Sequence, residues 1–96
     1  MPEGASFHGA VLAGCDFKNS FLSGVDFTSS DLRDVCFDET NVKISDFRGA
    51  DLRGASFREA TLCGALFSGA QIDNVCTENA TWYGANVTDL RVLAAK

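Results

Sequence analysis

The stretch Ser45–Ala70 reads SDFRGADLRGASFREATLCGALFSGA and repeats its character every five residues. A bulky apolar residue stands at the centre of each unit, as Phe47, Leu52 and Phe57 do. The residue two positions before each centre is small, and the residue two positions after it is often Gly, as at Gly49. A period of five fits neither the 3.6-residue turn of an α-helix nor the two-residue alternation of a strand. The stretch therefore predicts a repeat architecture.

The same pattern continues from Ala5 to Val87 without an insertion. Sixteen of the 17 central residues are apolar, and they include seven of the eight Phe. The small position, the central position and the Gly-rich position of the unit each follow their own pattern along the chain. Proline would remove a backbone donor from paired strands, and Pro2, the one proline, lies outside the repeats. The central residues are Phe7, Leu12, Phe17, Leu22, Phe27, Leu32, Phe37, Val42, Phe47, Leu52, Phe57, Leu62, Phe67, Ile72, Thr77, Trp82 and Val87.

These units resemble the pentapeptide-repeat family, whose unit is a small residue, Asp or Asn, Leu or Phe, and two variable residues. The resemblance implies an all-β fold, a right-handed quadrilateral parallel β-helix (a solenoid) with four units to a coil and about four coils. We expect residues 1–4 to form an N-terminal extension and residues 5–87 to form the β-helix. Thr88 can act as a helix N-cap, and Leu90, Leu93 and Ala94 share a helical face, so residues 88–96 predict a short C-terminal capping helix. Departures from the family pattern are Val11, Phe21, Leu66 and Gln71 in the Asp position, Thr77 at a centre and Ile44 in the Gly-rich position.

With four units to a coil, residues 20 apart stack on one of four walls. The first Phe wall has the centres Phe7, Phe27, Phe47 and Phe67, and the second Phe wall has Phe17, Phe37, Phe57 and Thr77. The Asp–Arg wall has the centres Leu12, Leu32, Leu52 and Ile72, and the neutral wall has Leu22, Val42, Leu62 and Trp82.

Charged residues stack in columns on two of these walls. The second Phe wall carries Lys18, Asp38, Arg58 and Glu78, whose alternating signs predict a surface ion ladder in which each pair contributes about 0–1 kcal/mol. On the Asp–Arg wall like charges stack and opposite charges sit diagonally, beside Arg33 and Arg53. The candidate acidic face there consists of Asp31, Asp34, Asp51 and Asp73.

The neutral wall carries one formal charge and turns Phe21, Ile44 and Tyr83 toward solvent. Scattered apolar residues are normal on protein surfaces. An apolar patch on a flat wall is also a candidate partner surface. The sequence therefore offers Phe21, Ile44 and Tyr83 as candidate partner-binding residues.

The cysteines and the histidine do not indicate catalysis or metal binding. Cys15 falls in an inward position, Cys36 and Cys76 share a column two coils apart, and Cys63 is outward and alone on the neutral wall. Two coils are about 9.6 Å, too far for a disulfide. Free thiols favour a reducing, cytoplasmic location. His8 is the only histidine, and no nucleophile or phosphate-loop motif occurs, so we expect no enzyme activity, no cofactor and no metal.

Thirteen acidic against eight basic residues give a net charge of −5, which argues against direct nucleic-acid binding. The apolar runs are too short to span a membrane. The favoured function is a non-catalytic rod that binds or scaffolds a protein. The alternative comes from the resemblance, because some family members mimic DNA and bind DNA gyrase. It implies gyrase as partner, and an end-to-end or C-terminal homodimer. Balanced charge columns favour the rod.

Overall fold

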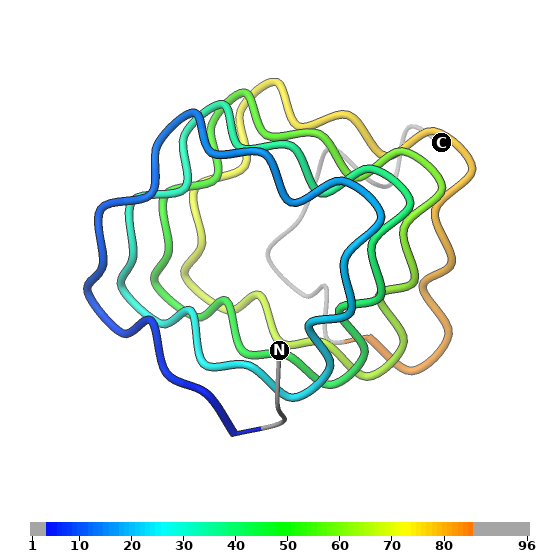
Figure 1. Cartoon of the computed structure of the whole chain (residues 1–96), viewed down its shortest axis with the longest axis horizontal. Helices are drawn as coiled ribbons and strands as arrows, with labels where there is room; N and C mark the ends of the chain where they lie inside the picture. The colour runs from blue at the N-terminus through cyan, green and yellow to red at the C-terminus, as the bar shows by residue number, and fades with distance from the viewer. Residues whose placement is uncertain (1–3, 86–96) are drawn as a thin grey trace.

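The computed structural model describes residues 4–85 and shows a stack of coils in which each coil traces a four-sided ring (Figure 1). Parallel backbone bridges join residues 20 apart, from Ser6–Asp26 to Thr61–Thr81, so four units complete one coil. This confirms the expected β-solenoid. The unit centred on Val87 and the expected capping helix at 88–96 lie outside the described residues, and the right-handed sense of the coil stays a prediction.

Residues 4–85 contain no helix and no extended strand, because the chain turns in every unit. Pairing is by isolated bridges, one per unit, at the residue before the centre. Leu32 N–H donates to Asp51 O over 2.8 Å, and Asp51 N–H donates to Ser30 O over 2.9 Å. Each wall is therefore a column of short parallel contacts. Within this range no helix is long and apolar enough to cross a membrane.

A tight turn forms each corner of the coil. At every described corner except Leu22–Val25, the carbonyl of the central residue accepts a hydrogen bond from the N–H three residues later, as between Leu52 O and Ala55 N at 2.9 Å. At Leu22–Val25 the Ser45 hydroxyl bonds to both groups. The residue before that N–H has a positive φ in every described unit, which is the signature of a type II turn. Gly occupies nine of these corners. The other corner residues are Asn19, Ser29, Asp34, Glu39, Ile44, Glu59, Asn74 and Asn79.

Stacked Phe rings fill the interior. Phe47 is fully buried, and its ring stacks on Phe27 at 5.1 Å and on Phe67 at 5.0 Å between ring centroids. The rings of the other Phe column meet it edge-on, with Phe37 at 5.8 Å and Phe57 at 5.7 Å. Opposite walls therefore carry the two Phe columns, as the alternation of Phe and Leu predicted.

Small residues complete the core beside the rings. Ala50, Ala55 and Ala65 are fully buried. Polar residues in the equivalent position bind the backbone: Ser45 Oγ donates to Leu22 O over 2.7 Å and accepts from Val25 N–H over 3.2 Å. Within the part of the chain that the structure describes, every buried side-chain nitrogen or oxygen has a hydrogen-bond partner.

The side chain in the Asp or Asn position accepts a hydrogen bond from the backbone. In the described part of the chain, the N–H that follows each central residue makes no hydrogen bond to the backbone of another coil. Where Asp or Asn stands two residues earlier, its side chain accepts this N–H, as when Arg48 N–H donates to Asp46 Oδ1 and Lys43 N–H to Asn41 Oδ1, both at 3.0 Å. Arg58 N–H, which has Ser56 in that position, donates instead to Asp38 Oδ1 of the neighbouring coil over 3.0 Å. Asp and Asn readily accept such local bonds. A surface position therefore has a structural reason for its residue type.

Val11 breaks this rule, and replacing it should stabilise the protein. Its side chain is 80% exposed and cannot accept the N–H of Ala13, which makes no bond within residues 4–85. Val11→Asn should raise the free energy of unfolding by about 0.5–1 kcal/mol through one new hydrogen bond. Urea denaturation of wild type, Val11→Asn and the control Val11→Ala checks this. Equal gains from Asn and Ala would show that the hydrogen bond contributes nothing.

Candidate binding surface

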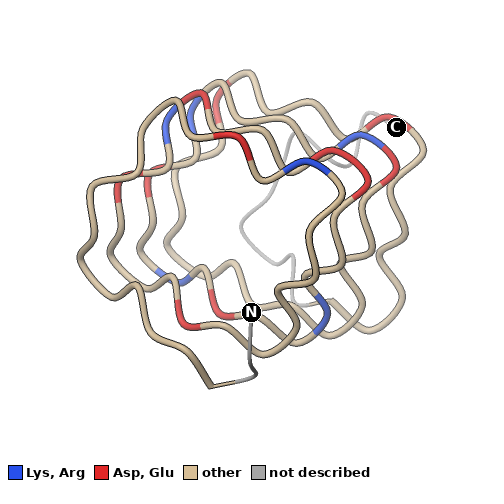
Figure 2. Cartoon of the chain, viewed as in Figure 1, with Lys and Arg blue, Asp and Glu red and all other residues tan. Residues whose placement is uncertain are grey.

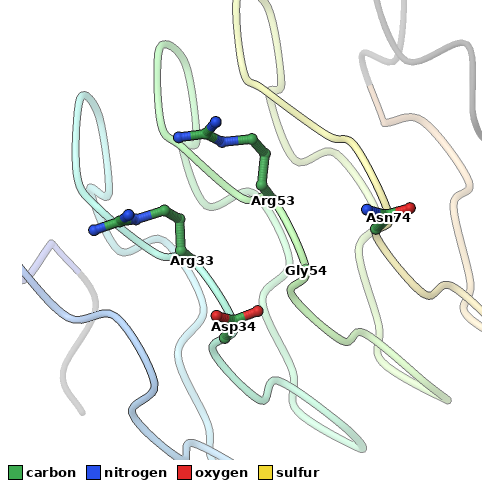
Figure 3. A pocket seen from close by; sticks show the side chains of 5 residues that line it. All are labelled: Arg33, Asp34, Arg53, Gly54 and Asn74. Carbon is green, nitrogen blue, oxygen red and sulfur yellow. The ribbon is translucent and has the colours of Figure 1, made fainter.

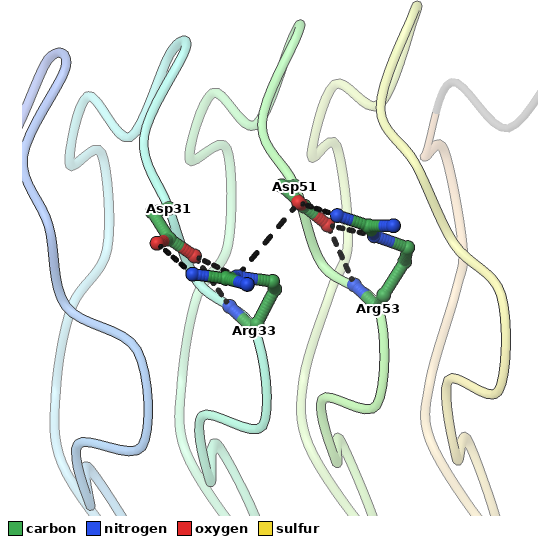
Figure 4. A network of polar contacts seen from close by, with 4 residues as sticks. All are labelled: Asp31, Arg33, Asp51 and Arg53. Atoms are coloured by element: carbon green, nitrogen blue, oxygen red, sulfur yellow. Dashed lines mark hydrogen bonds and ion pairs between the residues drawn. The ribbon is translucent and has the colours of Figure 1, made fainter.

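Asp and Arg side chains form a flat ionic network on the Asp–Arg wall (Figure 4). Arg33 Nε donates to Asp31 Oδ1 and Arg33 Nη2 donates to Asp31 Oδ2, each over 2.8 Å. Arg53 binds Asp51 in the same way at 2.8 and 2.6 Å, and Arg33 Nε lies 4.0 Å from Asp51. The diagonal contact of Arg33 with Asp51 is therefore the longer one, and the shortest pairs form within a unit. The central residue of the unit points inward, so the residues on either side of it both face outward and can meet.

These contacts hold the carboxylates in their ionised form. Hydrogen bonds from the Arg33 side chain and backbone N–H lower the pKa of Asp31 to about 2. The Arg53 side chain lowers the pKa of Asp51, and the Arg48 side chain lowers that of Asp46. Arg33 and Arg53 thus neutralise Asp31 and Asp51, two of the four residues of the expected acidic face.

Acid should therefore destabilise the protein through this network. Because the folded pKa of Asp31 lies below its unfolded value of about 3.9, its stabilising contribution is complete above about pH 4 and is lost as the pH falls toward 2. Asp31→Asn/Asp51→Asn should be less stable than wild type near neutral pH and should lose less stability on acidification. Urea midpoints between about pH 2 and pH 7 measure this. The control Asp73→Asn should follow wild type, and parallel curves for all three would contradict the expectation.

The other two residues of the candidate acidic face lie apart from the network. Asp34 occupies a corner, and its carboxylate lies against Gly54, where an added Cβ would come 2.2 Å from Asp34 Oδ1. Asp34, Gly54 and Asn74 line a shallow depression of about 280 Å³ together with Arg33 and Arg53, whose side chains extend in the same direction from neighbouring coils (Figure 3). Asp34 and Asp73 are exposed and make no ion pair with another described residue. The four acidic residues share a wall but form no single-sign face.

The ion ladder on the second Phe wall is shorter than expected. Arg58 pairs with Glu78 at 3.4 Å, whereas Lys18 and Asp38 make no ion pair among residues 4–85. Asp38 instead accepts hydrogen bonds from Ser56 Oγ and, over 3.0 Å, from Arg58 N–H. Asp38 is therefore bound by Ser56 and the Arg58 backbone of the neighbouring coil, and of the three pairs expected in the ladder, all within the described residues, only Arg58–Glu78 forms.

Acidic residues of the same wall were missed from the sequence. Asp16, Glu39 and Glu59 also lie on the second Phe wall, so it is more acidic than the Asp–Arg wall. Writing out every outward position at a spacing of 20 would have found them. Basic segments still lie beside acidic ones on neighbouring coils (Figure 2).

The cysteines follow the expected columns with one exception. Cys15 is half-buried and packs against the core, and parallel bridges place Cys36, Ser56 and Cys76 in one column. Cys63, expected to be exposed, is half-buried, whereas Cys76 is exposed. Burial raises the pKa of the Cys36 thiol, which keeps it protonated. No cluster of metal-ligating side chains occurs in the described range.

Apolar exposure is concentrated on the neutral wall. Four large hydrophobic residues are exposed in the described chain, and three of them are Phe21 at 59%, Ile44 at 58% and Tyr83 at 87%. The fourth, Val11, lies on the Asp–Arg wall. Lys43 is the one charged residue among the outward positions of the neutral wall. The candidate partner-binding residues therefore share an exposed wall with little charge.

A family model described as pentapeptide repeats matches residues 5–43 and 45–81 in eight copies. The chain belongs to the pentapeptide-repeat family. Ile44 is the one internal residue that lies in neither matched stretch. No curated protein matches the chain significantly.

Solved pentapeptide-repeat structures share the fold. The protein alr5209 from Nostoc PCC 7120 superposes with a TM-score of 0.79 at 23% identity, over 94% of this chain and 80% of that one. QnrB1, a plasmid-mediated fluoroquinolone resistance protein, superposes with a TM-score of 0.68 at 23% identity, over 85% of this chain and 55% of its own. Both structures are similar to this chain in fold.

Proposed function

We propose that this pentapeptide-repeat protein is a non-catalytic, protein-binding rod whose binding face is the neutral wall. The observation that carries the proposal is the gathering of three of the four exposed large hydrophobic residues, Phe21, Ile44 and Tyr83, on one wall with little charge. Interface cores are depleted of charge and enriched in aromatic residues. The other three walls present Asp residues outward.

The polar groups of the described chain support a binding role over catalysis. Asp31, Asp46 and Asp51 are occupied by Arg side chains on convex walls. A catalytic acid or base needs a pKa near the working pH and access to substrate, and these carboxylates have lowered pKa values. The free thiols are consistent with a cytoplasmic protein, which we include in the proposal.

Substitutions on two walls test the proposed face. Phe21→Ser/Tyr83→Ser removes apolar surface from the neutral wall, and Val11→Ser removes it from the Asp–Arg wall as a matched control. The partner is found by quantitative capture on the immobilised wild type and is then purified and titrated against each variant. We expect the double variant to bind at least about tenfold more weakly, roughly 1.4 kcal/mol, and the control to bind normally. Normal binding by the double variant would contradict the proposal.

Inhibition of DNA gyrase as a DNA mimic is the alternative proposal. Its support is the net charge of −5 and the acidic residues of the second Phe wall. The Asp–Arg pairs weigh against it, because they interrupt any acidic stripe on their own wall. A supercoiling assay with wild type and Glu39→Lys/Glu59→Lys, which inverts two exposed acidic residues of the second Phe wall, separates the two. Inhibition that weakens in the variant would favour mimicry, and no inhibition at roughly tens of micromolar would remove it.

A further inference from the structure

Ile44 has a backbone conformation that its side chain disfavours. Its φ is +53°, in the left-handed region. The other non-Gly corner residues are Asn, Ser, Asp or Glu, so Ile44 is the one β-branched residue among the described corners. A β-branched residue in this region is a clear outlier, and backbone strain of this kind concentrates at functional sites. The strain is retained although Gly is common at equivalent corners.

One side of the Ile44 side chain packs against the next coil, and the rest of it projects into solvent. Its Cγ2 would lie 2.9 Å from a Cβ added at Gly64, so the side chain packs over the bare backbone of the next coil. The column also contains Gly24 and Gly84, which leave the corner flat on both sides. Ile44 is nevertheless 58% exposed. A partner can therefore reach an apolar group whose position is already set.

Lys43 places a positive charge beside this projection. The four Arg of the described chain each pair with an acidic residue, whereas Lys43 is exposed and makes no ion pair within residues 4–85. Its backbone N–H is held by Asn41 Oδ1 at 3.0 Å, which fixes the start of the side chain. The other walls carry more acidic than basic residues. The neutral wall is therefore the one wall of the described chain with a net positive charge, which favours an acidic partner there.

We infer that Ile44 and Lys43 form the docking point for an acidic peptide segment. A large apolar side chain of the segment packs on Ile44, and a neighbouring Asp or Glu pairs with Lys43. The inference rests on the proposed function, because it names the partner chemistry of the same wall. It also explains why a strained Ile stands where Gly would be more stable.

A random peptide library displayed on phage provides the probe. Enriched peptides are synthesised and titrated against wild type, Ile44→Gly, Lys43→Glu, Phe21→Ser/Tyr83→Ser and the control Lys18→Glu, which inverts the other unpaired Lys of the described chain. We expect peptides with Asp or Glu beside a large apolar residue. Ile44→Gly and Lys43→Glu should each weaken binding at least tenfold, about 1.4 kcal/mol, and the control should not. Ile44→Gly should also raise the melting temperature by about 4–8 °C, because Gly accepts the corner conformation without strain.

The outcomes separate this inference from the proposed function. Peptides that need Phe21 and Tyr83 but tolerate Ile44→Gly and Lys43→Glu would overturn the inference and leave the neutral wall as the binding face. Peptides that tolerate every substitution on the neutral wall would overturn the inference, and the capture experiment would then decide the proposed function. A library without enriched acidic peptides overturns the inference, while the capture experiment decides the proposed function independently. Higher stability with unchanged binding in Ile44→Gly would also overturn it.

Discussion

Phe47→Ala should lower the free energy of unfolding by about 3–5 kcal/mol, the usual cost of removing a buried Phe. Phe47 is fully buried and touches four other rings, two stacked and two edge-on. Small domains have roughly 5–15 kcal/mol of stability in total, so this variant should be close to unfolding at room temperature. Urea denaturation followed by far-ultraviolet circular dichroism measures the loss.

Phe7→Ala provides the matched control, because Phe7 occupies the same wall but is only partly buried and meets two rings. In a solenoid each coil is stabilised mainly by its neighbours, so the end position should cost clearly less than the middle one. Equal losses for the two variants would contradict the stacked-ring core as the main source of stability.

Ala55→Leu should be the second most damaging change, at about 3 kcal/mol, near the upper end of the cost of overpacking a core. Ala55 is fully buried, and its carbonyl accepts the N–H of Cys76 over 3.0 Å, so the wall cannot move outward without losing that bond. The added side chain would compete with the Phe rings for the same interior. Thermal and urea unfolding give the size of the effect.

Ala13→Leu makes the same chemical change at an exposed position and should alter stability by less than about 0.5 kcal/mol. A tolerated Ala55→Leu would show that the interior has room that the ring stacking does not suggest. A large effect in both variants would point to the helix-favouring character of Leu rather than to packing.

The repeat allowed the fold to be predicted in detail. Five-residue spacing, with the four units to a coil that the family resemblance implies, placed Cys36 and Cys76 in one column, and the structure confirms this register. Phe47 and Ala55, which stand in the apolar and small positions of the repeat, are buried. No insertion disturbs the spacing, so register followed from counting. The Gly that recurs two positions after the centre lies at corners with positive φ, a conformation that favours Gly.

Contacts between surface side chains could not be predicted from the spacing. Whether Arg33 reaches Asp31 or a residue on the next coil depends on its rotamer, which a repeat does not specify. Asp38 was assigned to a ladder but is occupied by Ser56 and the Arg58 backbone. Ser23 stands in an outward position, but only 6% of its surface is exposed. The repeat spacing predicts the wall on which a residue lies, whereas the side-chain rotamer determines which residue it contacts.

The candidate partner-binding residues stay a prediction, and hydroxyl-radical footprinting of the rod with its purified partner tests them most directly. The four exposed large hydrophobic residues of the described chain react with hydroxyl radicals, so one experiment measures how strongly the partner protects each of them. They are Phe21, Ile44, Tyr83 and Val11. We predict that the partner protects Phe21, Ile44 and Tyr83 and leaves Val11 unchanged. Protection of Val11 with no protection of the other three would contradict the neutral wall as the binding face.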